Sequence, residues 1–276
     1  MLSRKNIAST LLCVFLSCAG SAHGLTLLPP LPHDCRVANE SADPQVRVDL
    51  YTRCLAGTGI DFETGAKMQD WQRYEIHFKR GNALFELRRY PEALADYDLF
   101  ISQSSGHVWA YHQRGLTHLA VGNNLKALAD FDEALKRNAE AIIVRYDRGQ
   151  LLAKLGKYRP ALVDLRFAVK ASPDTAAFAN ELAWLLATCP EAGIRDGREA
   201  LIFARKTVSI ERNAGYLDTL AAALARAGEF EQAVQIQSEA LGLLQKDKTE
   251  HENIKEFRER LDLYSSGKAY TDTRSK

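Results

Sequence analysis

Three segments of this chain begin with Arg-Gly and align with one another without a gap. Their glycines are Gly81, Gly115 and Gly149, which lie 34 residues apart. An alanine follows each glycine at the same distance in all three segments, and a large apolar residue stands one helical turn after each alanine. These two columns are Ala93, Ala127 and Ala161, and Tyr97, Phe131 and Leu165. Three columns that keep register over three segments predict a repeat architecture, in which each unit packs mainly on its neighbours.

The stretches between the repeated positions indicate helices. Apolar residues recur at helical spacing on both sides of a turn, and Gly122 and Gly156 mark this turn in the second and third units. No stretch alternates apolar and polar residues in the way that a half-buried strand does. We therefore expect each unit to be two helices joined by a short turn.

The pattern continues in altered form after the third unit. Ala183 follows Gly149 at the usual repeat spacing, and it is followed by Ala221 in the next unit. The step from Ala183 to Ala221 is longer by four residues than the step from Gly149 to Ala183. The extra residues fall in the stretch TCPEAGIRDG, which predicts a longer loop between the helices of the fourth unit.

These columns resemble the tetratricopeptide repeat (TPR), a helix–turn–helix unit of 34 residues, over about residues 74–245. The resemblance implies that small residues in the glycine and alanine columns let the two helices of a unit approach closely. It also implies an all-α superhelical solenoid of about five units with capping helices at both ends. The expected units are 74–107, 108–141, 142–175, 176–213 and 214–247.

The flanking segments fit such an array, because a solenoid must cover its terminal apolar faces. Apolar residues at helical spacing predict an N-terminal capping segment at 42–73 and a C-terminal capping helix at 249–264. We expect residues 25–41 to form a Pro-containing linker and residues 265–276 to form a disordered tail.

Residues 1–24 have the features of a secretory signal peptide. A positively charged start is followed by the apolar stretch IASTLLCVFL and by small residues, which favours cleavage near Ala22 or Gly24. The alternative is a lipoprotein signal in which Cys18 is lipidated, although the preceding residues FLS match that motif poorly. We therefore expect a periplasmic or secreted protein without a membrane-spanning segment after signal removal.

Three cysteines remain after signal removal. Cys35 and Cys54 lie in the same N-terminal segment, and we expect a disulfide between them in an oxidising compartment; the alternative is a pair of free, buried thiols. Cys189 is left over. No basic residue or histidine adjoins it, which favours a buried cysteine that closes a helix over a reactive one.

The TPR resemblance places a binding groove on the concave wall that the first helices of successive units form. The candidate groove residues on this wall are Phe78, Asn82, Phe85, Trp109, His112, Leu116, Tyr146, Gln150, Asn180 and Trp184. Aromatic anchors with a few amide groups suit an extended or helical peptide. The alternative is that some of these aromatic side chains are buried against a neighbouring helix.

One TPR binding mode is disfavoured. TPR domains that bind chaperone tails clamp a terminal carboxylate with lysine, asparagine and further basic residues. Asn82 alone matches that set, and the basic positions hold residues such as Phe78, Ile143 and Asp147. We therefore do not expect an acidic C-terminal tail as the ligand.

No pattern for catalysis or for a metal emerges from the sequence. The stretch GTGIDFETG lacks the lysine of a phosphate-binding loop. We expect His107, His112 and His118 to be surface residues on different faces rather than zinc ligands. The acidic pairs Asp96/Asp98 and Asp130/Asp132 are two residues apart on a helix, so they diverge, and we expect them to be solvated.

The charge balance, Lys plus Arg 36 against Asp plus Glu 35, gives no basic surplus for nucleic acid. The sequence therefore predicts a non-catalytic scaffold or adaptor of the cell envelope, without a cofactor or metal, that binds a protein or peptide partner. The alternatives are an accessory subunit of an envelope enzyme complex and a lipid-anchored scaffold.

Overall fold

A computed structural model of the chain describes residues 31–57, 67–246 and 251–273. The predicted signal peptide, Cys18 and residues 25–30 of the predicted linker lie outside these residues. The prediction of a linker is wrong for the remainder, because His33–Glu40 form a helix whose Cys35 and Ala38 are buried. The described residues form 13 helices. They are α1 (His33–Glu40), α2 (Pro44–Ala56), α3 (Asp70–Glu86), α4 (Tyr90–Gln103), α5 (Val108–Ala120), α6 (Asn124–Arg137), α7 (Ile142–Lys154), α8 (Tyr158–Ala171), α9 (Ala176–Thr188), α10 (Gly197–Ile210), α11 (Ala214–Ala227), α12 (Phe230–Lys246) and α13 (His251–Ser265).

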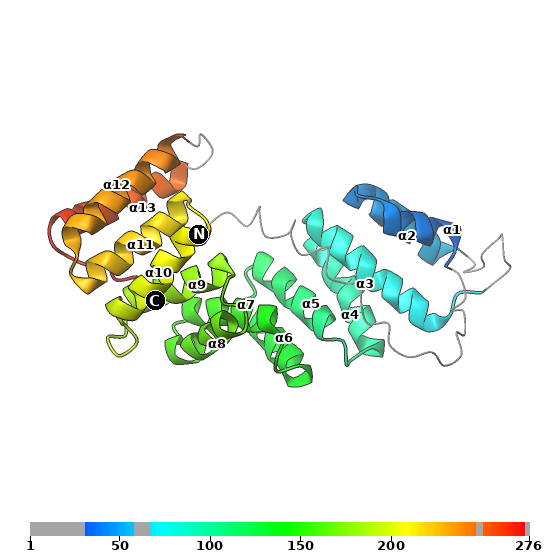
Figure 1. Cartoon of the computed structure of the whole chain (residues 1–276). Helices are drawn as coiled ribbons and strands as arrows, with labels where there is room; N and C mark the ends of the chain where they lie inside the picture. The colour runs from blue at the N-terminus through cyan, green and yellow to red at the C-terminus, as the bar shows by residue number, and fades with distance from the viewer. Residues whose placement is uncertain (1–30, 58–66, 247–250, 274–276) are drawn as a thin grey trace.

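The helices pack in chain order as antiparallel pairs, and each pair packs on the next. Figure 1 shows the pairs following an arc from α1 and α2 at one end to α12 and α13 at the other, with α6 and α8 on the outer side. This arrangement confirms the predicted all-α TPR solenoid. Among the described residues, no helix is both long and apolar enough to cross a membrane.

The repeated glycines are required because the two helices of a unit touch at these positions. A Cβ atom added to Gly115 would lie 2.7 Å from Cε1 of Phe131, and one added to Gly81 would lie 2.8 Å from Cε1 of Tyr97. The aromatic residue therefore occupies the space that a side chain on the first helix would need. The alanine column on the second helix, such as Ala127, is fully buried.

The short turn inside the first, second, third and fifth units contains a left-handed residue. Gly122, Gly156 and Gly228 supply it with φ values of 79°, 72° and 88°. In the first unit, Arg88 takes this conformation with φ 60°. Its backbone N–H donates to the carbonyl three residues earlier, and the N–H of the next residue donates to the carbonyl five residues earlier, as at Gly122. A side chain in this region is strained by about 1–2 kcal/mol.

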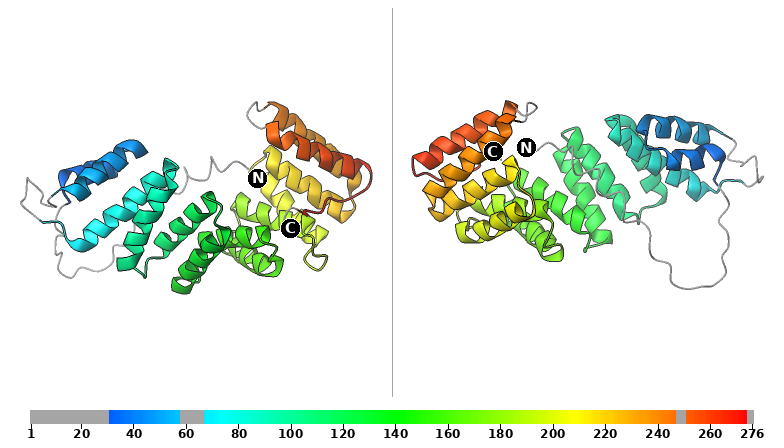
Figure 2. Two further views of the ribbon diagram at one scale, coloured as in Figure 1. Left: turned by 180° about the vertical axis from the view of Figure 1, so that it is seen from behind. Right: turned by 45° about the horizontal axis from the view of Figure 1, so that its top comes forward.

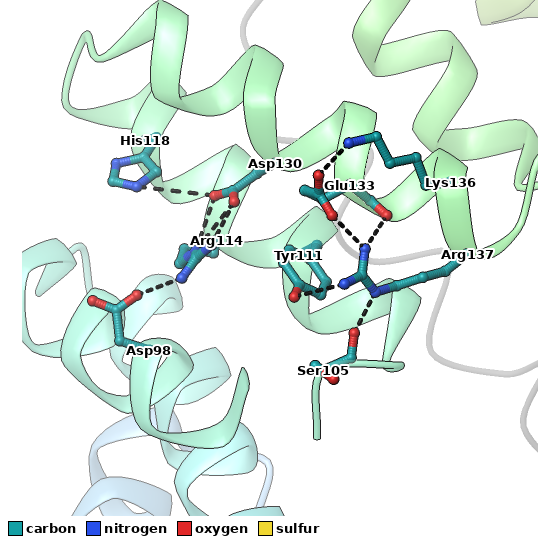
Figure 3. Close-up of polar contacts among 9 residues, drawn as sticks. All are labelled: Asp98, Ser105, Tyr111, Arg114, His118, Asp130, Glu133, Lys136 and Arg137. Carbon is teal, nitrogen blue, oxygen red and sulfur yellow. Dashed lines mark hydrogen bonds and ion pairs between the residues drawn. The ribbon is translucent and has the colours of Figure 1, made fainter. Parts of the chain in front are cut away.

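A column of arginine–aspartate pairs also repeats, with one pair in each of the first three units. Arg114 on α5 donates hydrogen bonds from Nε and Nη2 to both carboxylate oxygens of buried Asp130 on α6, and its Nη1 lies 2.6 Å from Oδ1 of Asp98 on α4, in the preceding unit (Figure 3). Each such arginine therefore joins two units as well as the two helices of its own unit. The corresponding pairs are Arg80 with Asp96 and Arg148 with Asp164.

These pairs correct the prediction that the acidic pairs are solvated. Asp96 and Asp130 are buried, whereas the side chains of Asp98 and Asp132 are 64% and 47% exposed, so the prediction is wrong for one member of each pair. Burial raises the pKa of Asp96, but hydrogen bonds from Arg80 and His77 outweigh it and hold that pKa below its usual value. A carboxylate with such partners stays ionised in spite of its burial.

The N-terminal helix pair closes the array. Cys35 and Cys54 form a disulfide between α1 and α2 with their Cα atoms 5.6 Å apart, which is the pairing predicted from the sequence. The guanidinium of Arg80 on α3 reaches Oγ1 of Thr52 on α2, in the way that the arginines of later units reach the preceding unit. The pair α1/α2 thus takes the place of a preceding repeat.

The long loop of the fourth unit begins at Cys189, the C-cap residue of α9. Cys189 is buried, and this burial raises the pKa of its thiol. Arg195 donates hydrogen bonds from the loop to the carbonyl oxygens of Cys189 and Pro190. These features agree with a cysteine that closes a helix.

Candidate functional site

The concave face of the array is formed by the first helices of the units, α3, α5, α7, α9 and α11. Direct contacts across unit boundaries join α3 to α5, α7 to α9 and α9 to α11. A row of side chains from successive units can therefore face one ligand along this wall, as the sequence predicts.

In the first unit, the candidate groove residues pack largely against the protein itself. The ring of Phe78 lies 5.1 Å from those of Phe100 and His107. Asn82 accepts a hydrogen bond from the Tyr97 hydroxyl, at 2.9 Å. Phe85 packs on the Tyr90 ring at 5.7 Å. Here the structure agrees with the alternative that these aromatic side chains contact neighbouring helices.

The second unit presents an exposed tryptophan beside a buried histidine. Trp109 is 37% exposed, and its ring lies 5.6 Å from that of His112. His112 is only 5% exposed, so the prediction of a surface histidine is wrong for this residue. Its Nε2 lies 2.6 Å from Oδ2 of Asp147 on the next first helix, α7. Leu116, one turn along α5, is half-buried.

Two other histidines lie beside this part of the wall. His107 and His118 are half-buried rather than exposed, and burial lowers the pKa of both imidazoles. His118 lies 3.9 Å from Asp130 (Figure 3). Nowhere in the described part of the chain do three or more His, Cys, Asp or Glu side chains gather in a way that could hold a metal ion.

The third and fourth units continue the wall with stacked rings and amides. Tyr146 is buried, and its ring lies 4.6 Å from that of Phe178. Gln150 donates to the Tyr146 hydroxyl at 2.9 Å and to Glu181 on α9 at 3.0 Å. Asn180, on α9, is 7% exposed. This region therefore combines an apolar surface with several amide groups.

Two buried polar atoms on this wall have no hydrogen-bond partner among the described residues. They are Nδ1 of His112 and Oδ1 of Asn180. An unpaired buried polar atom costs about 1–3 kcal/mol, so a ligand that pairs with it recovers that free energy. In the tautomer in which Nε2 of His112 donates to the Asp147 carboxylate, Nδ1 is an acceptor. Both atoms are fully buried, so a peptide N–H group reaches them only when the side chains that cover them move.

The last candidate residue is covered by the C-terminal end of the chain. The Trp184 ring lies 6.0 Å from the Tyr270 ring and 5.5 Å from the Arg260 guanidinium. Asp218, which follows on the α11 wall, is buried against Arg260 of α13 at 2.7 Å. The open part of the concave face therefore ends at the fourth unit.

Sequence reasoning missed two groups of residues. Trp71 is 52% exposed at the start of α3, and it lies four and seven residues before Glu75 and Phe78, on the same helix face. The arginine–aspartate column was also missed, although the sequence has an arginine directly before each repeated glycine and an aspartate at a constant spacing after that arginine.

A family model described as tetratricopeptide repeat matches residues 112–158 and 146–188. A comparison with curated proteins gave no match. Similar solved structures include a TPR protein from Parabacteroides merdae ATCC 43184, with 16% identity and a TM-score of 0.59 over 84% of this chain and 96% of that chain. YrrB, described as a TPR protein with an unusual peptide-binding site, has 20% identity and a TM-score of 0.55 over 68% of this chain and 98% of that chain.

Residues 41 to the end of MamA from Desulfovibrio magneticus RS-1 are 18% identical to this chain, with a TM-score of 0.57 over 66% of this chain and 99% of that one. At these identities the likeness concerns the fold. Together with the repeat match and the helix pairs described above, it shows that this chain is a TPR-containing protein.

Proposed function

We propose that this protein is a non-catalytic scaffold that binds an extended peptide segment of a partner protein on its concave face, between α3 and α9. The observation that carries the proposal is Trp109, which is 37% exposed on α5 beside His112, with the rings and amide groups of α7 and α9 further along the same wall. An exposed aromatic anchor followed by amide groups suits a peptide that supplies an apolar side chain and backbone polar groups.

The rest of the wall supports a preformed site. The rings of Tyr146 and Phe178 are stacked, and Gln150 is held between Tyr146 and Glu181. A site with fixed side chains loses less conformational entropy when it binds a ligand. The peptide-binding site for which YrrB is described also supports this function.

We further propose that the protein acts in the cell envelope. The N-terminal residues 1–24 have the composition of a secretory signal, and the Cys35–Cys54 disulfide is of a kind that persists in oxidising compartments. Fractionation of the source cells, with the protein found in the cytoplasm as a reduced dithiol, would overturn this location.

Photo-crosslinking tests the binding face. A photoreactive phenylalanine analogue is placed at Trp109 or, as the control, at Leu125, which is 74% exposed on the second helix α6. We expect a defined crosslinked partner from position 109 only, and we expect Asn180→Ala to reduce its yield about tenfold, since one buried acceptor contributes about 1–3 kcal/mol. Equal crosslinking from both positions, or no effect of Asn180→Ala in a folded protein, would refute the assignment.

A further inference from the structure

The chain after α13 turns back onto the array. Gly267, with φ 70°, reverses the chain, and the backbone N–H of Lys268 donates to the Leu263 carbonyl. The sequence predicted a disordered tail from residue 265, whereas the structure places residues 266–273 along the ends of α9 and α11. The left view of Figure 2 shows this tail in dark red, running from α13 across the yellow helices.

Backbone groups make most of the polar contacts of the tail, residues 266–273. The N–H of Asp272 donates to the Thr188 carbonyl at 2.7 Å. Nη2 of Arg226 donates to the Tyr270 carbonyl and, at 3.1 Å, to the Thr271 hydroxyl. Nε of the same Arg226 donates to the Ala187 carbonyl at 2.6 Å, which fixes the guanidinium against the end of α9.

The side chain of Tyr270 provides the apolar contact. Its ring packs on Trp184 at 6.0 Å, and the Arg260 guanidinium lies 5.4 Å from the Tyr270 ring and 5.5 Å from the Trp184 ring. Arg260 is itself buried and held by Asp218, so the cation that faces both rings is fixed in place.

We propose that Trp184, Arg226 and Arg260 form a binding site for an extended peptide segment that carries a tyrosine, and that the tail is its intramolecular occupant. Partner and tail then compete for this end of the concave face. The proposal rests on the proposed function, because Trp184 lies one helical turn beyond Asn180 on α9 and continues the same wall. The site recognises the peptide through its carbonyl and N–H groups, which every sequence has, and selects the aromatic ring by stacking.

The contacts of the tail suit an occupant that can be displaced. The side chains of Tyr270, Thr271 and Asp272 are all only half-buried. Ala269 and Tyr270 also pack on the core of the array. Contacts of this extent correspond to a dissociation constant of about 0.1 mM for the free peptide. The short connection to α13 gives the tail an effective concentration of about 1 mM, so the tail weakens the binding of a competing peptide about tenfold.

Fluorescence anisotropy with a labelled peptide of the tail sequence SGKAYTDT tests the proposal directly. We expect the full chain with Tyr270→Ala to bind this peptide about tenfold more tightly than the unaltered chain, since its own tail no longer competes. Lys268→Ala is the matched control, because this side chain is exposed, and it should bind as the unaltered chain does. A peptide with alanine in place of tyrosine should not bind.

The position of the site is tested in the Tyr270→Ala background. Both Trp184→Ala and Arg226→Gln should abolish peptide binding, with circular dichroism showing that the helices remain folded. Equal peptide binding by the unaltered and Tyr270→Ala chains, no binding by either, or unchanged binding after both site substitutions would overturn the proposal. A dimer of the unaltered chain that Tyr270→Ala converts to a monomer would also overturn it, since the tail would then occupy a second copy. The crosslinking from Trp109 tests the proposed function separately.

Discussion

Replacing buried Asp164 with alanine should destabilise the protein far more than replacing an exposed aspartate that pairs with an arginine of the same column. Asp164 is 1% exposed and accepts hydrogen bonds from Nε and Nη2 of Arg148, at 2.7 and 3.0 Å, and from Nη1 of Arg145, at 3.0 Å. Asp164→Ala leaves two guanidinium groups without this partner and opens a small cavity between α7 and α8.

The size of the effect follows from what each arginine retains. Breaking a buried ion pair by removing one partner costs about 3–5 kcal/mol. Arg148 keeps Asp132, at 2.7 Å, and Arg145 keeps the Ala139 carbonyl, also at 2.7 Å. Both arginine side chains are about a fifth exposed, so water solvates them partly. We therefore expect the free energy of unfolding to decrease by about 3 kcal/mol, the lower limit of this range.

Asp132→Ala is the matched control, because Asp132 binds the same Arg148 but has a side chain that is 47% exposed. An exposed ion pair contributes about 0–1 kcal/mol. Urea unfolding followed by circular dichroism gives the free energy of unfolding of both variants and of the parent. A difference of less than about 1 kcal/mol between Asp164→Ala and Asp132→Ala would refute the role assigned to the buried carboxylate.

Three further predictions concern other parts of the array. Gly115→Ala places a Cβ atom 2.7 Å from Phe131, so we expect the free energy of unfolding, measured in urea, to decrease by about 1–3 kcal/mol. An unchanged urea midpoint would show that α5 and α6 can move apart without a loss of stability. Because the pKa of Asp96 is lowered in the folded state, the contribution of Asp96 to stability should be constant above its usual pKa of 3.8 and be lost as the pH falls below it. Thermal unfolding between pH 6 and pH 2.5 should show this loss, and a smaller one for Asp96→Asn; equal acid sensitivity of the two proteins would contradict it. Replacing both Cys35 and Cys54 with serine removes the disulfide and should cost about 3 kcal/mol in urea unfolding under non-reducing conditions, whereas equal stability would show that the cap does not depend on it.

The fold was predictable from the sequence because the repeated positions are set by backbone proximity. Where two helices touch, as at Gly115 and Phe131, only a small residue opposite a large one fits, so the constraint is visible in the chain. The buried position of His112 was not visible, because its partner Asp147 lies 35 residues away on another unit. Such a pair becomes apparent only once the units are stacked.

The tail could not be predicted for a related reason. The residues SGKAYTDT have no helical periodicity. Their main polar contacts join two backbone groups, or join a backbone carbonyl of the tail to the Arg226 guanidinium that donates to it. Backbone contacts leave no pattern of residue types. The exposed position of Trp71 was missed because the expected first unit begins only at residue 74, whereas α3 begins at Asp70.

The arginine column also determines how successive units are joined. Arg114 and Arg148 each connect the second helices of two consecutive units, so the first three units are joined by charged links. In the fourth unit, Leu182 stands directly before the small-residue position, where the earlier units have arginine. At this joint the link comes from the other direction, because Arg166 on α8 pairs with Glu199 on α10 at 2.6 Å. On the concave side, Tyr146 stacks on Phe178 and Gln150 donates to Glu181 across the same joint. The third and fourth units are therefore held together on both faces, so we expect the wall between Tyr146 and Asn180 to keep one spacing when a ligand binds.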